Sequence, residues 1–397
     1  MEFDGGGRGA RGFGLAGLTA LALLAGTALA GAQTIIVGID EKVSWDDSGK
    51  QTLHPPGKDM LQVLSIAGNP AQPKSVATIP LANSIVGPPT NLAVHPSGDF
   101  ALVANSVEVQ KDGDALKQVP DNKLYVVDLK ANPPKVIQTV ETGKQPSGLA
   151  INAKGDLALV TNRADNSISV VSIKGREIKV VDTVAMGDSV ATVAITPDGK
   201  RALAVKPTVN KVALLAIDGE KVTYDKHDMT VGVFPYNVAV TPNGKLAMTA
   251  NNGFGGGSDG NVDTVSVIDL EANPPRVIDH VVVGDAPEGF AISPKGDLAV
   301  AILLRGSNAD KNAFYYHKTG ALVALKIDGK KVRKVGEVAL GGLPEGVAFS
   351  PDGKHIYVGN FMDSDMSILK VEGDKVTDTG KKMKLAGHPA SVRGVVK

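Results

Sequence analysis

Two glutamates at matching positions of neighbouring repeats are the residues best suited to chemistry. Glu288 and Glu345 each follow a proline. The other repeats carry uncharged residues at that position, namely Thr90, Ser147, Ala191, Tyr236 and Ala390. Two carboxyl groups brought together can share a proton, which raises one pKa and suits acid–base catalysis. They can instead hold a divalent cation, helped by amide oxygens such as those of Asn91 and Asn237 one position later.

A structural role for the two glutamates is the alternative. Each carboxylate would then accept backbone N–H groups or pair with Lys206, Arg305 or Arg393. Buried carboxylates are ordinarily satisfied in one of these two ways, without any catalytic role.

Cationic and imidazole side chains near the ends of second strands, or in loops, form a second candidate set. Its members are His54, Arg163, Lys206, Arg305, His317 and His388. An arginine binds a carboxylate or phosphate through its bidentate fork, and we expect Arg163, Lys206, Arg305 and His317 to contact a ligand. The aromatic Tyr236 is expected to contact the ligand as well. His388 directly precedes an opening proline, where it would stabilise negative charge beside the glutamates. Solvated loop charges would explain each of these residues singly.

The chain that carries these residues repeats one unit of four short strands. The clearest copy places strands at 148–152, 157–162, 167–173 and 178–184, with Gly-containing turns between them. Short alternating apolar runs separated by such turns are typical of an antiparallel meander. The opening of the unit recurs at 89–94, 146–151, 190–195, 235–240, 287–292 and 344–349.

The seventh copy of the unit is divided between the two ends of the chain. Its opening begins at Pro389, and the strands that it lacks are expected at 34–40, 59–66 and 74–81. The sequence therefore predicts an all-β, seven-bladed β-propeller of four-stranded antiparallel blades, closed by pairing of the C-terminal strand with the N-terminal blade. Closure would remove the exposed edges of an open sheet. An open β-sandwich or solenoid is the alternative.

Three second strands carry a short motif that resembles a known family. Leu102-Val-Ala-Asn105, Leu159-Val-Thr-Asn162 and Tyr357-Val-Gly-Asn360 each follow a Gly-containing hairpin turn, and they resemble the exported YVTN-repeat β-propellers. The resemblance covers residues 34–397 and implies the fold. It implies several activities, because propellers of this kind include lactonases, surface-layer proteins and binding proteins.

Loop lengths suggest where a ligand would sit. The loops between second and third strands are long at 40–58, 106–123, 252–262 and 304–320, and short in the other three blades. These loops emerge at the mouth of the central channel where the unit openings converge. Long loops on two pairs of adjacent blades would form two walls with a cleft between them.

The N-terminal segment has the pattern of a secretory signal peptide. Arg8 and Arg11 precede an uncharged stretch, 15–30, that ends in small-residue cleavage signals before Gln33. We expect residues 1–32 to be removed and residues 33–397 to form one propeller domain in the periplasm or outside the cell. A membrane anchor is the alternative, but the stretch is shorter than the roughly 20 residues that span a bilayer. No later segment is long enough for a membrane span.

The composition excludes several classes of function. Lys and Arg together number 42, as do Asp and Glu, so the chain lacks the basic surplus of a nucleic-acid-binding protein. It contains no cysteine, which excludes thiolate catalysis, Cys-ligated zinc and covalently attached haem.

Together these observations predict a periplasmic or secreted propeller that binds a small molecule or an envelope-protein partner at the channel mouth. A lactonase-like hydrolase or lyase that uses Glu288 and Glu345, with or without a divalent cation, is the first alternative. A structural surface-layer protein is the second. The sequence indicates no cofactor other than this divalent cation.

Overall fold

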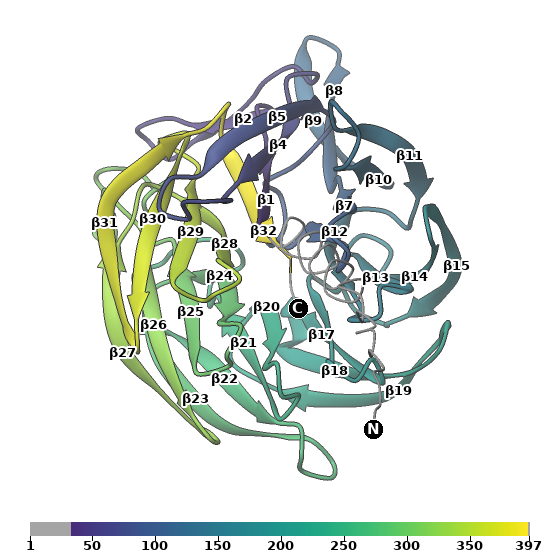
Figure 1. The fold of residues 1–397 in the computed structure, drawn as a ribbon. Helices are drawn as coiled ribbons and strands as arrows, with labels where there is room; N and C mark the ends of the chain where they lie inside the picture. The colour runs from purple at the N-terminus through teal and green to yellow at the C-terminus, as the bar shows by residue number, and fades with distance from the viewer. Residues whose placement is uncertain (1–32, 396–397) are drawn as a thin grey trace, which may run out of the picture.

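The described part of the chain forms a ring of seven β-sheets around a central channel (Figure 1). The computed structural model describes residues 33–395, and the predicted signal peptide, 1–32, lies outside them. Each sheet has four antiparallel strands and forms one blade. The predicted all-β, seven-bladed propeller is confirmed. No helix within residues 33–395 is long and apolar enough to cross a membrane.

Blades are numbered 1–6 from Pro89, and blade 7 combines both ends of the chain. From the inner to the outer strand, blades 1–3 comprise β6 (Leu92–Val94), β7 (Phe100–Ala104), β10 (Lys123–Asp128) and β11 (Lys135–Glu141); β12 (Pro146–Ile151), β13 (Leu157–Asn162), β14 (Ser167–Lys174) and β15 (Glu177–Ala185); β16 (Val193–Ile195), β17 (Arg201–Lys206), β18 (Lys211–Asp218) and β19 (Lys221–Thr230). A short 3-10 helix, η1 (Pro207–Val209), follows β17.

In the same order, blades 4–7 comprise β20 (Pro235–Val240), β21 (Leu246–Asn251), β22 (Asp263–Asp269) and β23 (Arg276–Gly284); β24 (Pro287–Ile292), β25 (Leu298–Leu303), β26 (Ala321–Asp328) and β27 (Lys331–Ala339); β28 (Pro344–Phe349), β29 (His355–Asn360), β30 (Asp365–Glu372) and β31 (Lys375–Lys384); β32 (Pro389–Gly394), β1 (Thr34–Ile39), β4 (Met60–Ser65) and β5 (Lys74–Pro80). Two hairpins lie in loops, β2 (Val43–Trp45) with β3 (Gln51–Leu53), and β8 (Val107–Asp112) with β9 (Ala115–Pro120).

The core lies between neighbouring blades. Successive side chains of a strand point to opposite faces of its sheet, so each blade packs against both neighbours. In β13, Leu159 joins the apolar cluster shared with blade 3, whereas Val160 joins the cluster shared with blade 1. The second strands are therefore buried on both faces, which explains their continuous apolar runs.

The ring closes where the two ends of the chain meet. β32 pairs with β1, with Val392 opposite Val37, and the purple and yellow strands lie side by side in Figure 1. Both valines are fully buried. Beyond β32, Val395 forms a parallel bridge with Val94 of blade 1. The predicted pairing of the C-terminal strand with the N-terminal blade is confirmed.

The channel has two different mouths. The inner strands begin at one end, called the upper mouth below, where the loops between second and third strands also lie. The inner strands end at the lower mouth, in the first hairpin turns of the blades. One such turn has Gly199 at φ +70°, and Asp198 accepts a hydrogen bond from the Lys200 N–H at 3.0 Å. Glycine suits this position because residues with a Cβ rarely adopt positive φ.

The long loops of blades 4, 5 and 7 contact one another, so the prediction of two separate walls was wrong. The loop of blade 7 reaches across blade 6 to the loop of blade 5, where Asp47 and Lys311 form an ion pair of 2.7 Å. The loop of blade 4 contacts the same loop, because Gly260 packs against Tyr315 and Phe314. Blade 6 has a short loop, which leaves room for this crossing.

Removing the closing strand should open the ring. Truncation after His388 leaves β1 without its inner partner and removes Val392 from the core. We expect the free energy of unfolding to fall by at least ~2 kcal/mol, since burial of one such side chain alone is worth roughly 1.5–3 kcal/mol. The exposed edge should also promote association. Thermal unfolding and analytical ultracentrifugation would measure both effects. Truncation after Val395 is the control, and equal losses in the two variants would contradict closure through β32.

Candidate functional site

Four side chains from four blades meet at the upper mouth. Tyr236, Glu288 and Glu345 occupy one repeat position on blades 4, 5 and 6. They are 4%, 5% and 2% exposed, so all three are more than nine-tenths buried. Arg163, directly after β13 of blade 2, interacts with Tyr236 and Glu288. These four residues are called the mouth cluster below.

The backbone before each glutamate fixes its direction. Ala286 and Leu343, which precede the prolines, have φ of +53° and +46°. Their carbonyl groups accept hydrogen bonds from Leu304 and Phe361 at 3.0 and 2.9 Å. Such strained residues persist only where the surroundings hold them in place, and they are common at functional sites.

The glycine after Glu345 permits close packing of two inner strands. A Cβ at Gly346 would overlap the backbone nitrogen of Val392 in β32, and its φ of +73° also favours glycine. Glu345 is thereby held against the strand that closes the ring.

An apolar layer, called the roof below, surrounds the start of these strands. Its fully buried members are Val43, Ile85, Ala286, Leu304, Leu343, Phe361 and Ala390. Trp45 extends the roof and packs edge-on against Phe361, with ring centroids 5.5 Å apart. Because Ala286 and Leu343 lie two residues before the glutamates, the roof helps to exclude water from both carboxyl groups.

The two carboxyl groups share an environment that favours their neutral form. Burial raises the pKa of Glu288 from 4.5 to about 8, although the nearby Arg163 guanidinium opposes this rise. Burial also raises the pKa of Glu345 well above its usual value, and the charge of Glu288 raises it further. At neutral pH the pair therefore retains a proton.

Tyr236 completes the cluster as a neutral hydrogen-bond donor. Burial raises the pKa of its hydroxyl, the Arg163 guanidinium opposes the rise, and the two glutamates add to it. Arg163 lies over the tyrosine ring, with its guanidinium carbon 5.7 Å from the centroid. Blade 3, which lies between the blades of these two residues, carries the small Ala191 at the matching position.

The cation beside the glutamates differs from those expected. Lys206, Arg305 and Arg393 were the predicted structural partners, and that pairing was wrong because Arg163 is the neighbouring cation. Lys206 is buried in blade 3, where it pairs with Asp188 at 3.2 Å and Asp228 at 3.3 Å. Its Nζ also donates to the Tyr224 hydroxyl at 2.9 Å. A cation satisfied in this way stabilises its own blade.

Two further predicted ligand residues, Arg305 and His317, lie together in the loop of blade 5. Arg305 pairs with Glu337 of the outer strand β27 at 3.3 Å. The Nδ1 atom of His317 lies 3.2 Å from the Arg305 carbonyl oxygen and 3.0 Å from that of Tyr315. These contacts place the two side chains within their own loop, and none of them reaches the mouth cluster.

His388, the predicted third catalytic residue, is held by the roof. Its Nδ1 atom lies 2.7 Å from the Phe361 carbonyl oxygen and 3.1 Å from Ser364 Oγ. The ring stacks on Phe361 with centroids 4.9 Å apart, and the backbone N–H donates to Glu41 at 2.9 Å. These contacts give His388 a positioning role at the junction of blades 6 and 7.

The two predicted amide ligands lie at the upper mouth with different partners. Asn237 Nδ2 donates to the backbone oxygen of Glu288 at 3.2 Å, not to its carboxylate. Asn91 Nδ2 donates to Asn83 Oδ1 at 2.6 Å and to Ala104 O at 2.9 Å.

The described residues do not provide a metal site around the glutamates. Between residues 33 and 395, no group of three or more histidine or acidic side chains is arranged to hold a metal ion. A carboxyl pair that retains a proton is also a weaker ligand for a hard cation. Glu288 and Glu345 were predicted as metal ligands, but no third histidine or acidic side chain of the described residues joins them.

Several buried polar atoms near the closing strand have no hydrogen-bond partner within the described chain. They are Glu345 Oε2, Asn91 Oδ1, Asn83 Nδ2 and Ser391 Oγ. Asn83 Nδ2 and Ser391 Oγ lie close together, because both would contact a Cβ added at Gly38. Buried polar atoms are costly when unpaired, so this set suits water or the hydroxyl groups of a ligand.

A buried ionic cluster below the loop of blade 7 was not predicted from the sequence. Lys42 is fully buried and donates to Asp59 and to the Asn83 carbonyl oxygen, with Asp40 at 3.4 Å. Burial raises the pKa of Asp40. Asp40 in turn accepts a hydrogen bond from the Ile85 N–H at 2.8 Å. The cluster thus holds segment 83–85, which contributes to the roof. Charges at the edge of a predicted long loop gave no sign of burial.

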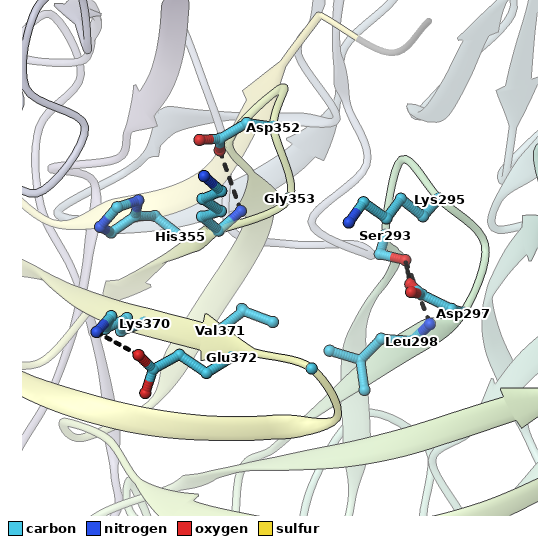
Figure 2. Close-up of a pocket in the computed structure, with 12 residues that line it drawn as sticks. Ser293, Lys295, Asp297, Leu298, Asp352, Gly353, His355, Lys370, Val371 and Glu372 are labelled. Carbon is cyan, nitrogen blue, oxygen red and sulfur yellow. Dashed lines mark hydrogen bonds and ion pairs between the residues drawn. The ribbon is translucent and has the colours of Figure 1, made fainter.

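A cavity of about 460 Å³ lies at the lower side of blades 5 and 6, and Figure 2 shows the residues that line it. Its polar residues are paired locally: Ser293 with Asp297 at 2.8 Å, and Lys370 with Glu372. Burial lowers the pKa of His355, which lines the same cavity. Since lysines and acidic residues alternate around it, the cavity favours neither an anion nor a cation.

Comparisons with known proteins support the fold. No protein-family model matches the sequence, and no curated protein matches it either. The periplasmic gluconolactonase of Pseudomonas aeruginosa is similar in structure, with a TM-score of 0.62 and 17% identity over 92% of this chain and 99% of that one. Hydrazine synthase of Kuenenia stuttgartiensis gives a TM-score of 0.59 and 19% identity, over 79% and 91%.

A protein of unknown function from Desulfotomaculum acetoxidans has a TM-score of 0.64 and 13% identity, over 90% of this chain and 99% of that one. At such low identity, the likeness extends to the propeller fold alone. Neighbours with such different names agree with the general rule that a fold does not fix an activity.

The raised pKa values should make stability depend on pH. Between the ordinary value of 4.5 and about 8, the folded pair keeps a proton that the unfolded chain releases. The native state then binds more protons, so the free energy of unfolding falls as pH rises through this window. Glu288→Gln should flatten that fall by on the order of 2–4 kcal/mol, since each pKa unit is worth about 1.4 kcal/mol. Urea unfolding at pH 5, 6, 7 and 8 would measure it.

Glu141→Gln, which alters an exposed glutamate of blade 1, is the matched control and should leave the pH profile unchanged. Other groups with raised pKa values, such as Asp40 and Glu108, contribute equally to wild type and variants. Superimposable profiles for wild type and Glu288→Gln would show that Glu288 is ionised throughout this pH range, which would contradict the raised pKa.

Proposed function

We propose that the protein hydrolyses a small hydroxylated lactone at the mouth cluster. The observation that carries the proposal is the buried pair Glu288 and Glu345, which retains a proton beside Arg163. Ester hydrolysis needs a base for water, an acid for the leaving oxygen and donors for the oxyanion, and this cluster contains all three types of group.

The surroundings assign different roles to the two glutamates. Glu288 is the more exposed and lies beside Arg163, so it is the carboxylate that ionises first, as the pH approaches about 8. It takes a proton from water as the water oxygen attacks the lactone carbonyl carbon. Arg163 and the Tyr236 hydroxyl stabilise the negative charge on the carbonyl oxygen. Glu345 gives its proton to the ring oxygen as the carbon–oxygen bond breaks. The pair again holds one proton, and the product is a hydroxy acid.

Two further observations support this substrate class. The unpartnered polar atoms of Asn83, Asn91 and Ser391 suit the hydroxyl groups of a sugar-derived ring. A solved structure of similar fold is named a gluconolactonase. The lactone substrate is neutral, which also suits the cluster. Only the hydroxy-acid product carries a negative charge that Arg163 would attract.

A binding function without turnover is the second candidate. The observation that favours it is the burial of Glu345, of which only 2% is exposed, because a carboxyl group so enclosed offers little surface to a reacting substrate. In this case the cluster would bind a small hydroxylated molecule or the side chain of an envelope-protein partner.

The protein is proposed to act in the periplasm or outside the cell. The signal-like pattern of residues 1–32 supports export, and the similar gluconolactonase is named as periplasmic.

Hydrolysis of a panel of five- and six-membered sugar lactones would test the proposal, with acid release followed at pH 8, near the pKa of Glu288. Glu288→Gln should lower kcat at least ~100-fold, because general acid–base catalysis is worth about 10²–10⁴. Arg163→Met should lower kcat/KM by a similar factor, because it removes a donor to the oxyanion. Glu141→Gln should retain wild-type rates.

The two candidates differ in their outcomes. Turnover by the double variant Glu288→Gln/Glu345→Gln at the wild-type rate would contradict the catalytic role. Thermal stabilisation by an unreacted lactone or its hydroxy acid, abolished by Arg163→Met, would instead establish the binding function.

A further inference from the structure

The inner strands carry a second irregularity, at the lower mouth. Six repeats place alanine in the fifth position of the opening, where blade 7 has Arg393. The six are Ala93, Ala150, Ala194, Ala239, Ala291 and Ala348. The next position is a large apolar residue in these six repeats and Gly394 in blade 7. Blade 7 therefore has a long cationic side chain where the other blades have alanine. It has a glycine where they have a large apolar residue.

A cavity of about 310 Å³ occupies this end of the channel, called the lower cavity below. Inner strands of all seven blades line it, together with the prolines of the first hairpin turns. Its walls are mainly alanine, valine, isoleucine and phenylalanine, and Arg393 is the only charged residue among them. Its volume is at the lower end of the roughly 300–1,000 Å³ typical of small-molecule sites.

Arg393 has no anionic partner within residues 33–395. Every ion pair of the described chain involves other cations, and the Arg393 side chain donates no hydrogen bond there. Burial lowers the pKa of Arg393 to about 10, and no carboxylate opposes this shift. The guanidinium is nevertheless charged at neutral pH. Arg393 is partly exposed, so its guanidinium can contact a ligand in the channel, and a bound anion would pair with its charge beside the apolar walls.

We propose that the lower cavity binds a small amphipathic carboxylate. The carboxylate pairs with two of the guanidinium nitrogens of Arg393, and the hydrocarbon part lies against the alanine and β-branched side chains of the inner strands. Charge complementarity fixes one end of the ligand, and apolar burial holds the rest. The site lies at the opposite end of the inner strands from the mouth cluster and is independent of the proposed hydrolysis.

Binding of decanoate to the full chain, measured by isothermal titration calorimetry at pH 7, tests the proposal. Wild type should bind decanoate at one site, and decanol, which lacks the charge, at least tenfold more weakly. Arg393→Gln should weaken decanoate binding at least tenfold and leave decanol binding unchanged. Arg333→Gln alters an exposed arginine of β27 and is the matched control. Circular dichroism would confirm that each variant is folded.

Equal decanoate affinity in wild type and Arg393→Gln would overturn the proposal, as would the absence of binding to both. The carboxylate of the chain's own C-terminus is a rival anion. A chain extended by ten Gly and Ser residues moves that carboxylate away. Decanoate binding only to the extended chain would identify the terminus as the occupant and overturn the proposal for a free ligand. Equal binding to both chains supports it.

Discussion

The pairing of β32 with β1 is the interaction on which the rest of the structure depends. It joins a strand from each end of the chain, and it brings blades 6 and 1 to opposite sides of blade 7. Gly346, directly after Glu345, packs against the closing strand. Arg393 lies in that strand itself. Both ends of the channel thus acquire their chemistry through ring closure, because neither the mouth cluster nor the lower cavity exists on one blade alone.

Exclusion of water is the second constraint. The roof and the inner strands bury Glu288 and Glu345 together, and two charged carboxylates so close in an apolar setting would be strongly destabilising. Protonation lowers that cost, and Arg163 compensates the charge that forms when Glu288 ionises. Further out, Lys42 and two aspartates hold the segment that contributes Ile85 to the roof. The apolar roof therefore covers the site, and the buried ionic cluster around Lys42 holds part of the roof in place.

The fold could be predicted from the sequence because the signals are local and repeated. Alternating strands, Pro-x-Gly turns and the split seventh unit each follow from the properties of short segments. The repeat position also singled out Glu288 and Glu345, whose proximity follows from ring geometry. The partner of the pair was harder to predict, because the reach of the Arg163 side chain from blade 2 to blade 4 depends on the small residue between them.

The conformation of the loops was the feature least predictable from the sequence. Loop lengths were correct, but the crossing of blade 6 by the loop of blade 7 depends on contacts such as Asp47 with Lys311, which no local pattern encodes. The burial of Lys42 was missed for the same reason. Three residues of suitable type were expected near the mouth, namely Lys206, Arg305 and His388. Contacts with neighbours in the same blade or loop determine where their side chains lie.

The central claim is that the glutamate pair holds at least one proton at neutral pH. Infrared difference spectroscopy between wild type and Glu345→Gln at pH 7 would test it directly, because protonated and ionised carboxyl groups absorb at separate frequencies. We expect the variant to lack protonated-carboxyl absorption that wild type shows at pH 7. A difference spectrum in which the variant loses only ionised-carboxylate absorption would contradict a shared proton.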